Sequence, residues 1–230
     1  ILITALTIAF LYFGCSTGLH SSKMSELLKI SDYTVREKDI SSANPSSFGN
    51  AAVWMNIETM NRRGGLESKW KWEQHDVNIA KSYLDSMVKD GQINGYKFVK
   101  TSELETKTVE SLAKKAGEDA DSAIVIKTLV EVDWYFNPAA ILDLTIIAAY
   151  WIPGSNRDAL AKTKIEFIDL KHKKLLFSSE GEELSRICEP AFLIDTNEVV
   201  SEAKINSLRE AFKGLYKKML DFRNRNTRHL

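Results

Sequence analysis

An uncharged apolar run opens the chain and constrains how everything after it is interpreted. Residues 1–14 read ILITALTIAFLYFG, contain no charged side chain, and end directly before Cys15. A run of this length and composition is typical of the apolar region of an export signal. We expect residues 1–14 to be a signal peptide, truncated at its amino end, that takes no part in the fold.

The junction at Cys15 indicates what becomes of this segment. Gly14 is a small residue directly before the cysteine, and the arrangement resembles the lipobox of bacterial lipoproteins. The resemblance implies cleavage between Gly14 and Cys15 and a diacylglycerol on the Cys15 thiol, so membrane lipid is an expected partner. Ser16, as second residue of the mature chain, then implies sorting to the periplasmic face of the bacterial outer membrane.

Two alternatives to lipidation stay open. Residues 1–19 are uncharged, and about 20 apolar residues cross a bilayer as a helix, so one alternative is an uncleaved membrane anchor. The other is an ordinary buried strand or helix. Cysteine usage agrees with lipidation: Cys15 and Cys188 are the only cysteines, and acylation of the first leaves no pair for an intrachain disulfide.

The overall composition excludes several classes of protein. Hydrophobic residues make up 44% of the 230-residue chain and charged residues 27%, which is a globular rather than a disordered or collagenous composition. The 31 basic and 31 acidic residues sum to a formal net charge of zero. Because nucleic acid is captured mainly by positive charge, we expect no nucleic-acid partner.

The residues after the cysteine divide into a tether and a domain. Residues 16–50 contain many serines and no sustained apolar periodicity. We therefore expect residues 15–50 to form the lipidated cysteine and a flexible tether, with about 35 Å of root-mean-square reach and one helical turn near residues 27–30. Residues 51–230 are expected to form a single periplasmic domain.

Hydrophobic periods within the domain predict its elements. Alternation with period 2 predicts strands and a 3.6-residue stripe predicts helices. Asp76 is expected to cap the first helix, and Ser102 with Glu105 has capping-box spacing at the second. The predicted strands are 53–57, 96–100, 124–132, 142–152, 161–167 and 175–177, and the predicted helices are 76–91, 102–117 and 195–222.

This order, β-α-β-α-β-β-β-β-α, predicts a mixed sheet with helices packed on it, of the α+β or α/β class. The last helix carries an apolar seam and is expected to cover the strand 142–152. Lys162, Lys164 and Glu166 alternate with apolar residues, so they are expected to face water.

Two phrases of the sequence resemble a known family. Residues 142–150 read LDLTIIAAY, and residues 167–170 read FIDL, followed by residues 174–177, KLLF, and Gly181. They resemble the rhombotarget lipoproteins of bacterial envelopes over about residues 142–181. The element order from 51 to 177 is similar, more loosely, to the domain shared by curli-assembly and Tol-type periplasmic lipoproteins. The resemblance implies no assigned reaction.

The sequence contains no strong catalytic signature. Four histidines, His20, His75, His172 and His229, have no metal-ligand spacing, and no phosphate-binding or nucleophile-elbow motif occurs. We expect no metal, no cofactor and no enzymatic activity. Cys188 is the best catalytic candidate, with His75 or His172 as its base, although an inert thiol is the simpler interpretation.

Two further groups of residues carry charged or aromatic side chains that could have a function. Asp119 and Asp121 could form a carboxylate pair but are expected to be loop residues between a helix and a strand. Lys69-Trp70-Lys71-Trp72 interleaves basic and aromatic side chains. In a strand both tryptophans would share one face and could contact a partner, a glycan or a membrane interface. Burial of both rings is the alternative.

The leading hypothesis is a non-enzymatic, membrane-anchored lipoprotein whose domain binds a protein or an envelope polymer in cell-envelope assembly or secretion. One alternative is a periplasmic cysteine hydrolase that uses Cys188. Another is a structural subunit that oligomerises through the strand 142–152.

Overall fold

The computed structural model describes residues 19, 21–28, 47–61, 65–67, 69–99, 109–136, 155–189 and 195–227. Gly14, Cys15, the predicted strand 142–152 and the capping box of Ser102 and Glu105 lie outside these residues. The elements in chain order are α2 (Ser21–Leu27), β1 (Asn50–Met60), β2 (Leu66–Glu67), α4 (Gln74–Lys89), β3 (Gly95–Phe98), α5 (Val109–Ala116), β4 (Ser122–Phe136), β5 (Ser155–Asp169), β6 (Lys174–Glu189) and α6 (Thr196–Thr227).

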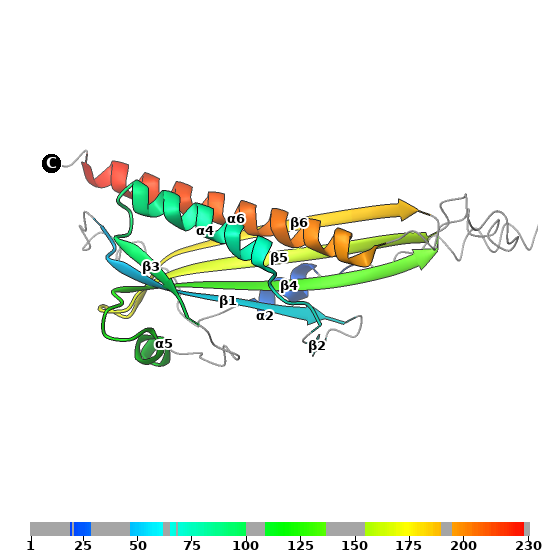
Figure 1. Cartoon of the computed structure of the whole chain (residues 1–230), viewed down its shortest axis with the longest axis horizontal. Coiled ribbons are helices and arrows are strands. Elements are labelled where there is room, and N and C mark those ends of the chain that lie inside the picture. Colours follow the sequence, from blue (N-terminus) through cyan, green and yellow to red (C-terminus); the bar gives the residue numbers. More distant parts are fainter. Residues whose placement is uncertain are drawn as a thin grey trace, which may run out of the picture.

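The described strands form one mixed sheet in the order β2-β1-β4-β5-β6, with β3 also paired to β1 (Figure 1). Strands β1 and β4 are parallel neighbours, from the pair Ala51 and Ser122 to the pair Met60 and Glu131. The pairs β4–β5 and β5–β6 are antiparallel. This sheet with its packed helices belongs to the α+β class, which confirms the predicted fold.

Helices α4 and α6 cover one face of the sheet, here called the front face. Ala51 and Val53 of β1 and Ile124 and Ile126 of β4 point to this side, in one buried cluster with residues of both helices. The apolar seam predicted for the last helix is confirmed in its central part, because Leu208, Phe212, Leu215 and Met219 are fully buried. The ring of Phe212 stacks on Tyr83 of α4 at 5.0 Å between centroids.

The backbone of helix α6 lies in direct contact with the backbone of strand β6 at Gly181. A Cβ atom built on Gly181 of β6 would lie 2.2 Å from the Ser207 carbonyl oxygen and 2.6 Å from the Ala211 nitrogen. Beside this contact, the buried hydroxyl of Thr163 is 2.7 Å from that of Thr128 and 2.8 Å from that of Ser207. Small residues thus allow the close approach, and a chain of hydroxyls satisfies the polar groups that it buries.

The opposite, back face is covered in two places, by α5 and by α2 (Figure 1). Near the amino end of β1, Trp54 packs in a cluster with Leu112 of α5. Further along, Met24 and Leu28 are completely buried in a cluster with strand residues that include Leu129. The structure therefore places residues 21–28, part of the expected tether, on the domain.

The expectation that Lys162, Lys164 and Glu166 face water is wrong. Glu166 is 1% exposed and Lys162 is 9% exposed. The alternation assigned these side chains correctly to the face opposite the main core, but it could not show that this second face is also covered. Charged side chains on it are accommodated by pairing with one another.

Other local differences concern element ends. Asp76 is not the cap of α4: Glu73 is the N-cap, and Asp76, three residues later, accepts a hydrogen bond from the Glu73 backbone N–H at 2.9 Å. Strand β6 continues twelve residues beyond Phe177, through a serine- and glutamate-rich stretch with little apolar alternation. Residues 69–73 lie in a connection rather than in a strand.

We predict that Gly181→Ala destabilises the domain by about 1–3 kcal/mol, the range for overpacking a tight site, because the new methyl group meets helix backbone that cannot rotate away. The matched control is Gly95→Ala, where a Cβ would have only one neighbour, at 3.5 Å. Denaturant unfolding followed by circular dichroism measures both. Equal midpoints for the two variants would show that α6 moves freely relative to β6.

Candidate functional site

The back face carries a row of ion pairs that crosses the long strands. Lys127 of β4 is 3.3 Å from Glu58 of β1, and Arg186 of β6 makes two hydrogen bonds, of 2.6 and 2.8 Å, to Asp158 of β5. The remaining pairs are Lys164 with Glu166 at 3.3 Å, Lys164 with Glu180 at 3.6 Å, and Lys162 with Glu182 at 2.9 Å.

Helix α2 is bound to this row at both of its ends. At its start, the Ser21 hydroxyl donates to the Glu182 carboxylate, with oxygen–oxygen distances of 2.8 and 2.9 Å. At its end, the Lys127 ammonium donates to the Leu27 carbonyl oxygen at 3.2 Å. A cation at a helix carboxyl end also interacts favourably with the helix dipole. Polar contacts thus fix the direction of α2 while Met24 and Leu28 supply its apolar contact.

The electrostatics of the Ser21 contact centre on Glu182. The Lys162 ammonium lowers the pKa of the Glu182 carboxyl, and the hydrogen bond from Ser21 lowers it further, against an opposing effect of burial. The carboxylate is therefore held ionised, the form that accepts hydrogen bonds from both neighbours.

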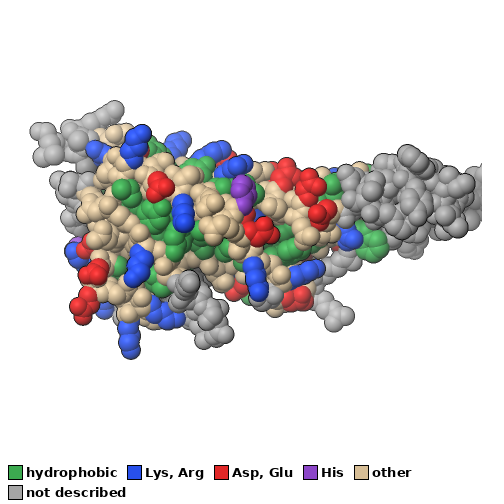
Figure 2. All heavy atoms as spheres, in the orientation of Figure 1, with side chains coloured by type: hydrophobic (Ala, Val, Ile, Leu, Met, Phe, Trp, Pro, Cys, Tyr) green, Lys and Arg blue, Asp and Glu red, His purple; other side chains and the backbone are tan. Residues whose placement is uncertain are grey.

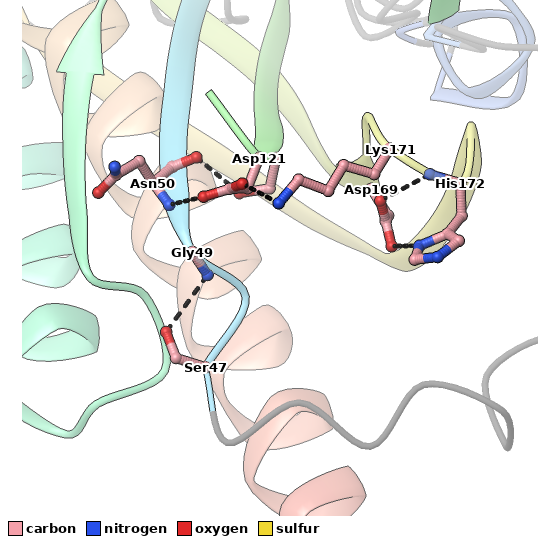
Figure 3. A network of polar contacts seen from close by, with 8 residues as sticks. Ser47, Gly49, Asn50, Asp121, Asp169, Lys171 and His172 are labelled. Carbon is pink, nitrogen blue, oxygen red and sulfur yellow. Dashed lines mark hydrogen bonds and ion pairs between the residues drawn. The ribbon is translucent and has the colours of Figure 1, made fainter. Parts of the chain in front are cut away.

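A second polar cluster lies where β1 and β4 begin, next to the β5–β6 turn (Figure 3). Asp121 accepts a hydrogen bond from the Asn50 backbone N–H at 2.9 Å and contacts the Lys171 ammonium at 2.5 Å. Lys171 and the Asn50 N–H lower the pKa of Asp121. In the same turn, Asp169 accepts from the His172 N–H at 2.9 Å and lies 2.7 Å from its Nδ1.

This cluster explains a glycine at the entry to β1. Gly49 has φ of +72°, and a Cβ there would lie 2.1 Å from the Asp121 carboxylate. Only glycine allows both the left-handed backbone and the close approach of the carboxylate. The expectation that Asp119 and Asp121 are loop residues is confirmed, since both precede β4. Asp121 serves to join three chain segments.

A cavity of about 360 Å³ lies beside this cluster, between β1, β3 and the carboxyl end of α5. Alanines form much of its lining, and Asn50, Lys97 and Asp119 supply its polar side chains. Among the described residues that line it, none is a cysteine, serine, threonine or histidine. The cavity therefore offers a binding surface for a small group, with Tyr96, Lys97 and Asp119 in its lining.

The aromatic and basic residues singled out from the sequence lie between β2 and α4. Trp70 and Trp72 are half-buried and pack against a cluster formed by the start of α6 and by residues of β1, β4 and β5, whereas Lys69 and Lys71 are exposed. The Lys69 ammonium is 5.3 Å from the Trp70 ring centroid. The rings are thus partly used in packing, and their contact with a partner stays a prediction.

Sequence reasoning missed a buried ion pair below these rings. Lys204 of α6 and Asp76 of α4 are 3% and 1% exposed, with nitrogen and oxygen 2.9 Å apart. The Lys204 ammonium also lies 5.8 Å from the Trp72 ring centroid. In the sequence Lys204 is one of many basic residues of the last helix, and only the crossing of two helices reveals its partner.

The structure separates Cys188 from both proposed histidine bases. His172 lies in the turn before β6 and Cys188 near its end, so about 15 residues of extended strand, roughly 50 Å, lie between them. Cys188 shares the back face with Arg186, two residues before it, whereas His75 is exposed at the start of α4, on the front face. Neither histidine is placed to activate the thiol.

Among the residues that the structure describes, no group of histidine, cysteine or carboxylate side chains has the arrangement of a metal site. No described helix combines the length and apolarity needed to cross a membrane. On the side seen in Figure 2, acidic and basic side chains are interspersed, as the zero net charge leads one to expect.

Comparison with known proteins adds distant structural similarity. No family model and no curated protein matches the sequence. A protein described as a neuraminyllactose-binding hemagglutinin homolog from Helicobacter pylori is 11% identical, with a TM-score of 0.43, covering 79% of this chain and 90% of that one. The lipoprotein GNA1162 from Neisseria meningitidis is 10% identical, with a TM-score of 0.32 and coverages of 69% and 97%.

The PelC dodecamer from Paraburkholderia phytofirmans is 14% identical, with a TM-score of 0.32, covering 72% of this chain and 88% of that one. The similar structures thus include a bacterial lipoprotein, but likeness at this level assigns neither a family nor an activity to this chain. The resemblance to rhombotarget lipoproteins stays a prediction.

We predict that acidification weakens the docking of α2. A carboxyl whose pKa is lowered by folding stabilises the folded contact above its unfolded pKa, and that contribution is lost as the pH falls through the lowered value. Amide hydrogen exchange of residues 21–28 at pH 7 and pH 3, expressed as protection relative to the intrinsic exchange rate at each pH, measures the release. Glu182→Gln should show the faster exchange already at pH 7 and a smaller pH effect, whereas Glu183→Gln, one residue away on the other face, should behave as the parent.

Proposed function

We propose that this chain is a lipid-anchored protein of the bacterial envelope. In this proposal the precursor is cut between Gly14 and Cys15, Cys15 is acylated, and the domain lies at the periplasmic face of the outer membrane. The domain has no catalytic activity of its own and binds a protein or an envelope polymer during assembly or secretion. The sequence resemblance to rhombotarget lipoproteins supports the same assignment.

The position of α2 is the observation that carries this proposal. Met24 and Leu28 are completely buried on the back face, so a cut after these residues would remove part of the fold. A cut at Gly14–Cys15 leaves α2 whole. Ser21 is six residues beyond Cys15, and six extended residues span at most about 21 Å. An acyl chain on Cys15 would thus hold the domain near the membrane while α2 is docked.

The geometry around Cys188 supports binding over catalysis. A cysteine nucleophile needs a base within hydrogen-bond reach, whereas His172 lies at the far end of β6 and His75 on the other face. The exposed Lys69 and Lys71, flanking half-buried tryptophans, are retained as a candidate partner contact. Their ammonium groups suit an anionic group of a ligand, and the flat faces of the Trp70 and Trp72 rings suit stacking on a planar or ring-shaped part of it.

The lipidation step is tested with radiolabelled fatty acid. We expect the native precursor to incorporate the label, and Cys15→Ser to lose it and accumulate as unprocessed or soluble protein. Cys188→Ser, which removes the other thiol, is the matched control and should retain full labelling. Equal labelling of Cys15→Ser and the parent protein would overturn the anchor.

The absence of cysteine catalysis is tested by thiol reactivity. We expect Cys188 to react with an iodoacetamide probe at pH 7 at the slow rate of an ordinary exposed thiol, because only the thiolate reacts and neither His75 nor His172 is placed to take its proton. His75→Ala and His172→Ala should leave the rate unchanged. Rapid labelling that either histidine substitution abolishes would instead favour the hydrolase.

A further inference from the structure

Strand β6 forms one edge of the described sheet. It is sixteen residues long, and among the described strands it pairs only with β5 (Figure 1). The backbone groups on the outer side of such a strand can pair with another chain. The exposed side chains of β6 determine which strand can pair with this edge.

Side chains on the back face of β6 form an exposed row. The strand alternates regularly over this stretch, with Gly181 and Ser185 buried on the front. Leu184 lies in the middle of the exposed row and is 50% exposed. The members of the row, in order, are Glu180, Glu182, Leu184, Arg186 and Cys188.

The order of charges in this row is complementary to itself. In an antiparallel pair of identical strands, centring the pairing on Leu184 places Leu184 opposite its copy and Glu182 opposite Arg186 of the other copy. The two-fold symmetry forms this pair of Glu182 and Arg186 twice. The register places no like charges opposite each other. The side chains of Glu182 and Arg186 are 40% and 55% exposed, so both extend from the surface at this edge.

Neighbouring registers lack this complementarity. Pairing centred on Glu182, Glu183 or Arg186 would place that residue opposite an identical charge. Centring on Ser185 would place Leu184 opposite Arg186 and form no opposite-charge pair. Cross-strand pairs of opposite charge stabilise a sheet and like pairs destabilise it, so the charges favour a single register.

We propose that two copies of this chain associate through their β6 strands, antiparallel and centred on Leu184, to form one continuous sheet. Residues opposite one another in such a pair lie on the same face, so the two-fold axis is perpendicular to the sheet. Both back faces, and both α2 helices, then lie on one side. If Cys15 is acylated as proposed above, both anchors emerge on that side and can enter one membrane.

A disulfide scan tests the register in the full-length protein, in membranes and in detergent. Directly opposite residues have Cβ atoms about 4.5–5.5 Å apart, close to disulfide geometry. In a Cys188→Ser background, Leu184→Cys should form a covalent homodimer on mild oxidation. Leu66→Cys is the matched control, because Leu66 is 45% exposed at the other edge of the sheet, and it should give at least tenfold less dimer.

Exchanging the charges of Glu182 and Arg186 tests the pairing in a second way, with a mixture of the two variants as the control for misfolding. Glu182→Arg places two arginines opposite each other in the homodimer, and Arg186→Glu places two glutamates opposite each other, so each variant alone should be monomeric in light scattering. A mixture of the two differently tagged variants restores both opposite-charge pairs and should co-purify as a heterodimer. A change in folding alone would not be repaired by mixing.

Several results would overturn the proposal. One is a Leu184→Cys dimer yield no higher than that of Leu66→Cys. Another is a crosslink from Leu184→Cys to a different protein and none to its own copy, which would assign the edge to a partner strand. A monomeric parent protein at 100 times its cellular concentration would also exclude self-association. Loss of lipidation with retained dimers would overturn the anchor and leave this pairing intact.

Discussion

The contact between the backbones of α6 and β6 at Gly181 determines how the rest of the front face packs. Because no side chain separates them, α6 lies close enough for Ser207 to join the buried hydroxyls of Thr163 and Thr128. The same approach places Phe212 against Tyr83, which connects α6 to α4. Helices α4 and α6 and the strands β1, β4, β5 and β6 thus share one core. With the front face closed in this way, α2 and α5 pack on the other face.

The sequence predicted the central residues of the helices and strands well. It predicted poorly which other parts of the chain pack on them. Alternation in β1, β4 and β5 and the seam of α6 follow directly from local periodicity, which depends only on backbone geometry. The burial of Glu166 and Lys162 could not be predicted in this way. It depends on the covering of the back face, which includes a helix more than 130 residues earlier in the chain, and on pairing between neighbouring strands.

The candidate site likewise has a part that the local sequence predicts and a part that depends on contacts between distant residues. The lipobox proposed at Gly14–Cys15 is a hypothesis that sequence alone can raise, because such a motif is a linear segment whose residues are adjacent. The contact between Ser21 and Glu182 joins residues 161 positions apart, and Asp76 and Lys204 are 128 positions apart. Neither pair has a local signature, since Ser21 begins a short helix and Lys204 is one of several lysines in a long one.

The energetics of α2 differ from those of the front-face helices. Its polar contacts involve side chains that are partly exposed, and such pairs each stabilise a fold by at most about 1 kcal/mol. Its apolar contact rests on Met24 and Leu28, each worth about 1.5–3 kcal/mol when buried, against the entropy of ordering every residue in the helix. Docking of α2 therefore rests on few contacts, and the hydrogen bond from Ser21 to the Glu182 carboxylate is one of them. Under the anchor proposed at Cys15, release of α2 would remove a contact that holds the domain near the acylated residue. A weak contact on the back face would then set how far the domain can move from the membrane.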